Sequence, residues 1–208
     1  PKSQEIARSD SILQNIYKMT SRVGDDIGYL YEDEPYSGSI LYELGFMDEF
    51  KTYGSKMYEL FKTKNVEQIV TVDPHTTNTL SNLKKHIQFD IPFVSYLNLV
   101  KDSQGNGEFV LHDSCLYSRF LNMHDTIREV LAKSGLKLVE DEFTTGKRFG
   151  VCCGAPVGPL DGSLSDSMAR MRMKSLNSLS KNVLVACPLC YVSLSPYGNV
   201  KDIAEVIK

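Results

Sequence analysis

The sequence lacks three features that would mark broad classes of protein. It has no long basic run, and its 23 basic and 26 acidic residues give a net charge of −3, so the phosphate-neutralising surface of a nucleic-acid-binding protein is missing. Its longest apolar stretches, such as residues 93–100 and 183–187, are too short to cross a bilayer, and the N-terminus lacks a secretory signal pattern. We therefore expect a cytoplasmic protein that neither binds nucleic acid nor spans a membrane.

Cysteine is absent from the whole first half of the chain. The five cysteines of the sequence are Cys115, Cys152, Cys153, Cys187 and Cys190. An odd number that includes one adjacent pair does not suit the disulfide framework of a secreted protein. We expect these thiols to be kept reduced, and therefore to be available as metal ligands.

The chain has 208 residues, 42% of them hydrophobic, and can bury a substantial core in one large domain or two small ones. Apolar periodicity predicts helices over residues 12–18, 77–87, 126–134 and 165–179, two helices within 39–64 that are separated at Gly45, and a final helix at the end of the chain. Short β-branched stretches predict strands over residues 66–72, 136–140 and 182–186. Helices that alternate with short buried strands indicate an α/β fold.

The two halves follow the same order of elements, which indicates a degenerate internal repeat. Residues 34–38 (EPYSG) align with residues 150–154 (GVCCG), and residues 73–76 (DPHT) align with residues 187–190 (CPLC). We predict two pseudo-repeated α/β lobes, a first lobe of residues 1–100 and a second lobe of residues 101–208, with short parallel sheets flanked by helices. The counterpart of Cys115 would precede Pro1, so the first lobe is expected to be truncated or to lack its opening element.

The spacing of the cysteines predicts a metal site in the second lobe. Residues 187–190 form a C-x-x-C pair, in which two intervening residues let both sulfurs face one ion. Cys152 and Cys153 are adjacent, and both can face one centre only from a tight turn, for which Gly154 and Pro156 are suitable residues. The glycine-rich stretch that follows leaves backbone amides free to donate hydrogen bonds to cofactor sulfur.

One set of residues carries a family resemblance. It comprises Cys115, the Cys152-Cys153-Gly154 triplet and the Cys187-Pro188-x-Cys190 pair, with His112-Asp113-Ser114 before the first cysteine. Over about residues 111–198 this pattern resembles the cysteine-rich "CCG" domain. That family includes the B-type subunits of heterodisulfide reductase and of the heterodisulfide reductase-like complexes of sulfur oxidisers. It also includes iron–sulfur subunits of glycolate oxidase and anaerobic glycerol-3-phosphate dehydrogenase.

The resemblance implies a redox function. All five cysteines would bind one non-cubane [4Fe–4S] cluster, with Gly154, Pro156 and Pro188 around it and His112 as an additional candidate. The chain would be an oxidoreductase subunit that acts in sulfur metabolism on disulfide, thiol or persulfide groups. Its partners would be subunits that carry flavin and cubane clusters. In the first lobe, Tyr36-Ser37 and residues 73–76 stand in place of the ligands, so one cluster rather than two is implied.

The residues alone leave two alternatives open. Four of the five thiolates suffice for a tetrahedral zinc site, although zinc leaves the fifth without a role. The metal, either zinc or a cluster, would then only stabilise the fold of a structural docking subunit. Clustering at these spacings argues against cysteines that merely pack in the core.

Two histidines lie near the predicted motif turns. His112 and His75 would donate a hydrogen bond to cluster sulfur, relay a proton or ligate metal if they are functional. We expect both to be structural, His75 especially, because the cysteine ligands of its motif are absent. His86 and His124 lie in predicted helices and are expected at the surface.

Charged residues and methionines flank the cysteine motif. Lys147 and Arg148 either offset the negative charge of a thiolate-bound cluster or belong to a solvated loop. Residues 168–173 combine three methionines with two arginines and predict a helix with one packed and one charged face. Methionines on its exposed side would adapt to a partner surface.

Overall fold

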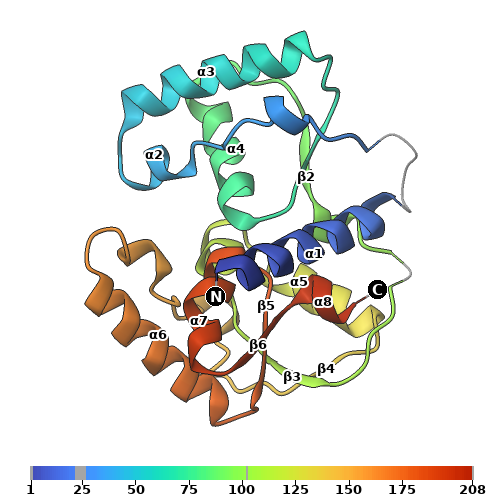
Figure 1. Cartoon of the computed structure of the whole chain (residues 1–208), viewed down its shortest axis with the longest axis vertical. Coiled ribbons are helices and arrows are strands. Elements are labelled where there is room, and N and C mark those ends of the chain that lie inside the picture. The colour runs from blue at the N-terminus through green and yellow to red at the C-terminus, as the bar shows by residue number, and fades with distance from the viewer. Residues whose placement is uncertain (1, 22–26, 102, 208) are drawn as a thin grey trace.

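The computed structural model describes residues 2–21, 27–101 and 103–207. Figure 1 shows a smaller group of helices above a larger group that surrounds the main sheet. The helices are α1 (Lys2–Ser21), α2 (Ser39–Glu43), α3 (Met47–Thr63), α4 (Pro74–His86), α5 (His124–Lys133), α6 (Gly162–Asn177), α7 (Pro188–Leu194) and α8 (Ile203–Val206). The strands are β1 (Ile69–Thr71), β2 (Phe93–Ser95), β3 (Glu108–Leu111), β4 (Lys137–Leu138), β5 (Asn182–Val185) and β6 (Asn199–Asp202).

Both sheets are short and parallel. In the first lobe β1 pairs with β2, with Val70 opposite Val94. In the second lobe the strand order is β4-β3-β5-β6, and all its neighbours are parallel. The predicted α/β class, with short parallel sheets flanked by helices, is therefore confirmed.

The main sheet is buried on both faces, as parallel sheets usually are. Successive side chains of a strand point to opposite faces. Leu184 therefore packs in one core, with α1, α5 and α8, while Val183 and Val185 pack in the other, with α6 and α7. Three of the five cysteines, Cys153, Cys187 and Cys190, belong to this second core.

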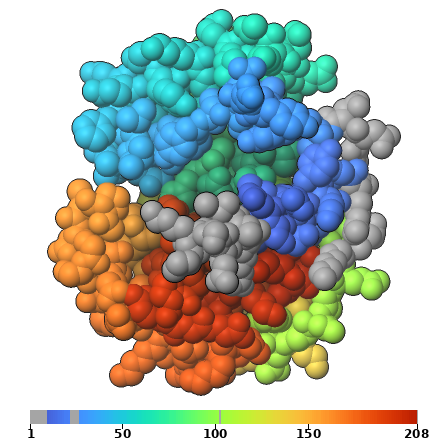
Figure 2. Space-filling view, in the orientation of Figure 1, coloured from blue at the N-terminus to red at the C-terminus, as the bar shows by residue number. Residues whose placement is uncertain are grey.

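Helix α1 packs against the second-lobe sheet although it begins the chain. Ile16 and Met19 are buried in the same core as Ile203 and Ile207, and the Asn15 side-chain amide donates to the Ala204 carbonyl at 3.0 Å. The remainder of the first lobe has its own core around Phe50 and Leu83. In the space-filling view the surface of the first lobe meets the surface of the second lobe (Figure 2). The division of the chain near residue 100 stays a prediction.

The same local order occurs in both halves. Gly38, with φ +77°, precedes α2 and α3, which are followed by β1 and by α4. Gly154, with φ +89°, precedes α6, which is followed by β5 and by α7. Both α4 and α7 begin with a proline, Pro74 and Pro188, whose fixed φ suits the first helical position.

Several elements differ in extent from the prediction. Helix α1 covers Lys2–Ser21 rather than residues 12–18. The strand predicted over residues 66–72 is reduced to β1, since only Ile69–Thr71 pairs with β2. Helix α4 begins at Pro74, before residue 77, because Asp73 caps it. Strands β2, β3 and β6 are absent from the prediction. In place of one final helix, α7 is followed by the polar edge strand β6 and then by α8.

Candidate metal centre

The five cysteines converge at one edge of the main sheet. Strands β3 and β5 are adjacent and parallel, so the segments that follow them emerge at the same edge. Cys115 follows β3 and precedes a π-helical turn, Leu116–Phe120. Cys187 follows β5 and is the N-cap residue of α7, within which Cys190 lies. The topology of the sheet thus joins cysteines that are far apart in the sequence.

Hydrogen bonds connect all five sulfurs in a chain. Cys115 and Cys153 both donate to Cys152, and Cys190 donates to Cys153 and to Cys187. Cys153, Cys187 and Cys190 are at most 3% exposed, whereas Cys115 and Cys152 are half-buried. The site is therefore closed on one side and accessible on the side of Cys115 and Cys152.

Two of the thiols ionise readily. Hydrogen bonds from Cys115 and Cys153 and from the Gly154 amide, whose nitrogen lies 3.4 Å from the Cys152 sulfur, lower the pKa of Cys152 to about 2. The hydrogen bond from Cys190 lowers the pKa of Cys187 to about 5, against the effect of burial. Metals bind thiolates rather than thiols, so this arrangement is prepared for a metal.

The turn at Gly154 brings the adjacent cysteine pair to the site. Its φ of +89° lies in the left-handed region, and a Cβ there would lie 2.8 Å from the Ser165 carbonyl oxygen and 2.7 Å from the Met168 Cβ. Pro156 lies in the next 3₁₀ turn, Ala155–Val157. Glycine is therefore required at this position by both conformation and space.

His112 lies beside the buried sulfurs. One ring nitrogen and the sulfurs of Cys153 and Cys190 lie within 4.8 Å of one another. The Arg172 Nε donates to His112 Nδ1 at 3.1 Å, and burial, followed by the Arg172 charge, lowers the pKa of His112 to about 3. The ring is therefore neutral with its proton on Nε2, which is buried without a partner. An N–H of this kind suits the sulfur of a cluster.

Arg172 is a site residue that the sequence prediction missed. Residues 168–173 were expected to form a helix with a charged face, but Arg172 is only 3% exposed. Its Nη1 donates to the Thr144 carbonyl at 2.6 Å. Burial lowers its pKa, and the charges of Asp113, Cys190 and Cys153 oppose that effect. A helical pattern would have revealed it, because Ala169, Arg172, Met173 and Leu176 occupy one buried face of α6.

An ion pair holds the segment that carries His112 and Cys115. Asp113 has a fully buried side chain and accepts two hydrogen bonds from Arg128, each 2.9 Å long. Arg128 also pairs with Glu140. Burial raises the pKa of Asp113, and Arg128 counteracts that rise. The paired geometry fixes the segment between β3 and the π-helical turn.

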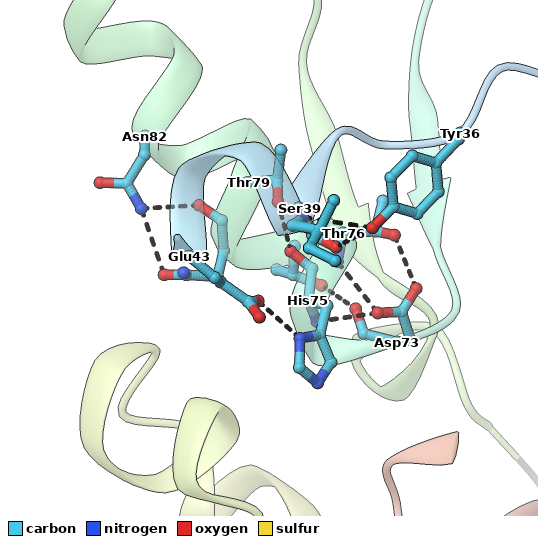
Figure 3. A network of polar contacts seen from close by, with 11 residues as sticks. Tyr36, Ser39, Glu43, Asp73, His75, Thr76, Thr79 and Asn82 are labelled. Atoms are coloured by element: carbon cyan, nitrogen blue, oxygen red, sulfur yellow. Dashed lines mark hydrogen bonds and ion pairs between the residues drawn. The ribbon is translucent and has the colours of Figure 1, made fainter. Parts of the chain in front are cut away.

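His75 contacts the metal centre from the first lobe. Its side chain forms a hydrogen bond with Cys187, and its Nδ1 lies 2.6 Å from the Glu43 Oε1. Figure 3 shows that the network around His75 comes from α2 and the start of α4. The expectation that His75 is structural stays a prediction, although the structure places a cysteine beside it. The cysteine that it meets belongs to the other lobe, which a motif read within one lobe cannot reveal.

The other candidates occupy varied positions. Pro188 directly follows Cys187 and opens α7. Lys147 and Arg148 are exposed in a 3₁₀ turn before the cysteine pair. Met171 is 74% exposed, whereas Met173 is buried and Met168 is half-buried.

Of the two histidines expected at the surface, His86 is exposed. His124 is not, because its side chain is only 12% exposed and its Nδ1 is buried without a partner.

Comparisons with known proteins agree with this geometry. Residues 109–195 match the family model of the cysteine-rich domain, CCG. The chain is 26% identical over 215 residues to a probable iron–sulfur-binding oxidoreductase, FadF, of Bacillus subtilis, with 97% of this chain and 30% of the relative covered. It is 27% identical over 227 residues to a probable membrane-anchored ferredoxin of Chromohalobacter salexigens, with 96% and 33% covered.

The chain therefore spans about a third of the length of these relatives. None of the helices in the described part of the chain combines the length and apolar character that a bilayer crossing requires.

Proposed function

We propose that this chain is an iron–sulfur redox subunit of a heterodisulfide reductase-like complex, since residues 109–195 match the family model of the cysteine-rich domain, CCG. Cys115, Cys152, Cys153, Cys187 and Cys190 would hold one non-cubane [4Fe–4S] cluster. The observation that carries the proposal is the continuous hydrogen-bonded set of five sulfurs from three separate segments.

The donor set favours a cluster over zinc. A tetrahedral zinc ion uses four thiolates, whereas five connected sulfurs suit a centre with several irons. The Gly154 amide and the unpartnered His112 Nε2 add N–H donors for inorganic sulfide or cysteine sulfur. A zinc ion or a purely structural cluster remains the alternative that the experiment below distinguishes.

The surrounding residues would have different roles at the site. A bound cluster would supply single electrons and iron atoms that can bind a substrate sulfur. Buried Arg172 places a positive charge near Cys153 and Cys190, which offsets the negative charge of bound thiolates. The half-buried Cys115 and Cys152 mark the side at which a disulfide, thiol or persulfide would approach.

Exposed apolar side chains support a role within a complex. Leu160 is 77% exposed, Leu164 49%, Leu189 42% and Val192 61%, and the latter three lie on the contacting helices α6 and α7. Apolar groups that gather at a surface often mark a binding face. We propose that subunits carrying flavin and cubane clusters dock there, in the cytoplasm, where thiols stay reduced.

Anaerobic purification followed by metal analysis tests the proposal. We expect about four iron and about four acid-labile sulfide per chain, together with an electron paramagnetic resonance (EPR) signal whose shape changes when a small thiol or disulfide is added. A colourless protein with about one zinc and no sulfide would contradict the redox function. A cluster whose spectrum ignores every added sulfur compound would support the structural alternative.

A further inference from the structure

The degenerate motif of the first lobe lies against the intact motif of the second. Residues 73–76 occupy the start of α4, which points toward the second lobe in Figure 1. From this position His75, only 8% exposed, forms its hydrogen bond with the fully buried Cys187. A motif without cysteines thus contributes a side chain to a cysteine site.

The backbone around His75 is fixed. The Asp73 Oδ1 accepts hydrogen bonds from the amides of His75 and Thr76, at 2.8 and 2.9 Å, and its Oδ2 accepts one from the Thr76 hydroxyl at 2.6 Å. The Thr79 hydroxyl donates to the His75 carbonyl at 2.8 Å. These contacts, drawn in Figure 3, leave the first turn of α4 with little freedom.

The imidazole ring is oriented as firmly as the backbone. Its Nδ1 lies 2.6 Å from the Glu43 carboxylate, whose side chain is one quarter exposed. Because a carboxylate accepts, Nδ1 carries a proton, and Nε2 is the nitrogen left to face Cys187. Carboxylate–histidine pairs of this kind commonly orient an imidazole toward a metal centre.

We propose that His75, oriented by Glu43, donates a hydrogen bond across the two lobes to the Cys187 sulfur and thereby raises the reduction potential of the cluster. Hydrogen bonds to ligand sulfur favour the reduced, more negative state of an iron–sulfur cluster. This inference rests on the proposed function, which it deepens by assigning a role to the first lobe.

His112, the other histidine near the sulfurs, lies beside Cys153 and Cys190. The Nδ1 of His112 accepts a hydrogen bond from the Arg172 Nε, so a guanidinium rather than a carboxylate orients this ring. The two histidines therefore contact different sulfurs, and a change at His75 tests the cross-lobe contact alone.

The experiment compares four variants with the wild-type protein. His75→Leu removes the donor, His75→Gln keeps an N–H group, and Glu43→Gln keeps the ring but removes the carboxylate that orients it. His86→Gln is the matched control, because His86 is exposed at the other end of the same helix. Iron and sulfide are measured first, and the reduction potential is then determined by redox titration followed by EPR.

We expect full cluster content in every variant. The potential should fall most in His75→Leu, less in His75→Gln and Glu43→Gln, and not at all in His86→Gln. A His75→Leu variant with full iron and sulfide content and the wild-type reduction potential would overturn the inference. It would leave the proposed function intact. Loss of iron with a new spectral type would also overturn it, since His75 would then be an iron ligand. Wild-type protein without iron would overturn both. If His75→Leu does not fold, Glu43→Gln decides by the same criterion.

Discussion

Two regions of the molecule share a backbone plan but differ in chemistry. Gly38 and Gly154 both adopt a left-handed conformation before a helical segment, and Asp73 and Cys187 both precede a helix that begins with proline. The Asp73 side chain caps its helix, whereas the Cys187 sulfur interacts with Cys190 and His75. The same backbone plan therefore accommodates a capping carboxylate in one region and a cysteine in the other.

The polar network of the first lobe lies at the segments that align with the cysteine motifs of the second lobe. In Figure 3, Tyr36 contacts Ser39, Asp73 contacts Thr76, and Glu43 contacts His75. These contacts join the turn at Gly38 to the start of α4, as the sulfurs join the corresponding turn to α7 in the second lobe. Hydrogen bonds between oxygen and nitrogen groups make this connection in the first lobe, and sulfurs make it in the second.

The largest expected effect is on iron content, when the aligned residues of the two motifs are replaced one at a time. Cys153→Ser removes a buried sulfur that is hydrogen-bonded to Cys152 and Cys190, and we expect loss of most of the iron and a changed EPR spectrum. Ser37→Ala, its counterpart in the first lobe, should leave both unchanged. An unaltered spectrum in Cys153→Ser would show that Cys153 is not a ligand. The metal centre would then have at most four cysteine ligands.

The two left-handed glycines provide a matched pair for stability. An alanine Cβ at Gly154 would meet the Ser165 carbonyl at 2.8 Å, whereas at Gly38 it would meet the edge of the Tyr53 ring at 2.9 Å. Conformational strain alone costs about 1–2 kcal/mol, and overpacking against backbone adds about 1–3 kcal/mol. We expect Gly154→Ala to lower the free energy of unfolding more than Gly38→Ala, as measured by anaerobic urea denaturation. Equal decreases in the free energy of unfolding would mean that the turn at Gly154 can relax as easily as the turn at Gly38.

The smallest expected effect concerns the helix cap that distinguishes Asp73 from Cys187. Asp73→Ala should lower the free energy of unfolding by about 1 kcal/mol, the usual cost of losing an N-cap, because two amides lose their acceptor. Asp73→Asn keeps a capping oxygen and serves as the control in the same urea titrations. If asparagine were as damaging as alanine, the charge of Asp73 rather than its capping geometry would be what the first lobe requires.

The α/β class and the tight turn after the adjacent cysteines could be predicted from the sequence. The residues that surround the sulfurs could be predicted less well. Short-range signals sufficed for these features, since spacing, Gly154 and the prolines act within a few residues. The ligand role of the five cysteines stays a prediction. The contact of His75 with Cys187 depends on how the lobes pack, which no local pattern encodes. Arg172 carried a usable signal in its helical spacing, but its charge suggested the surface.

Strand β6 escaped prediction for a different reason. Its burial alternates along Asn199–Asp202, but its composition is mostly polar, because it forms the edge of the sheet beside β5. Short polar edge strands have weak propensity signals and are defined mainly by their partner.

The packing of α1 on the second-lobe sheet determines when that lobe can be completed. Ile16 and Met19 share a core with Ile203 and Ile207, so this core joins segments separated by almost the whole described chain. Contacts of such long sequence separation form late, because the intervening chain must first be ordered. During synthesis the sheet edge that gathers the cysteines therefore cannot be fully supported until Ile207 has emerged from the ribosome. A metal centre that uses these sulfurs would accordingly be completed only after residue 207 has been synthesised.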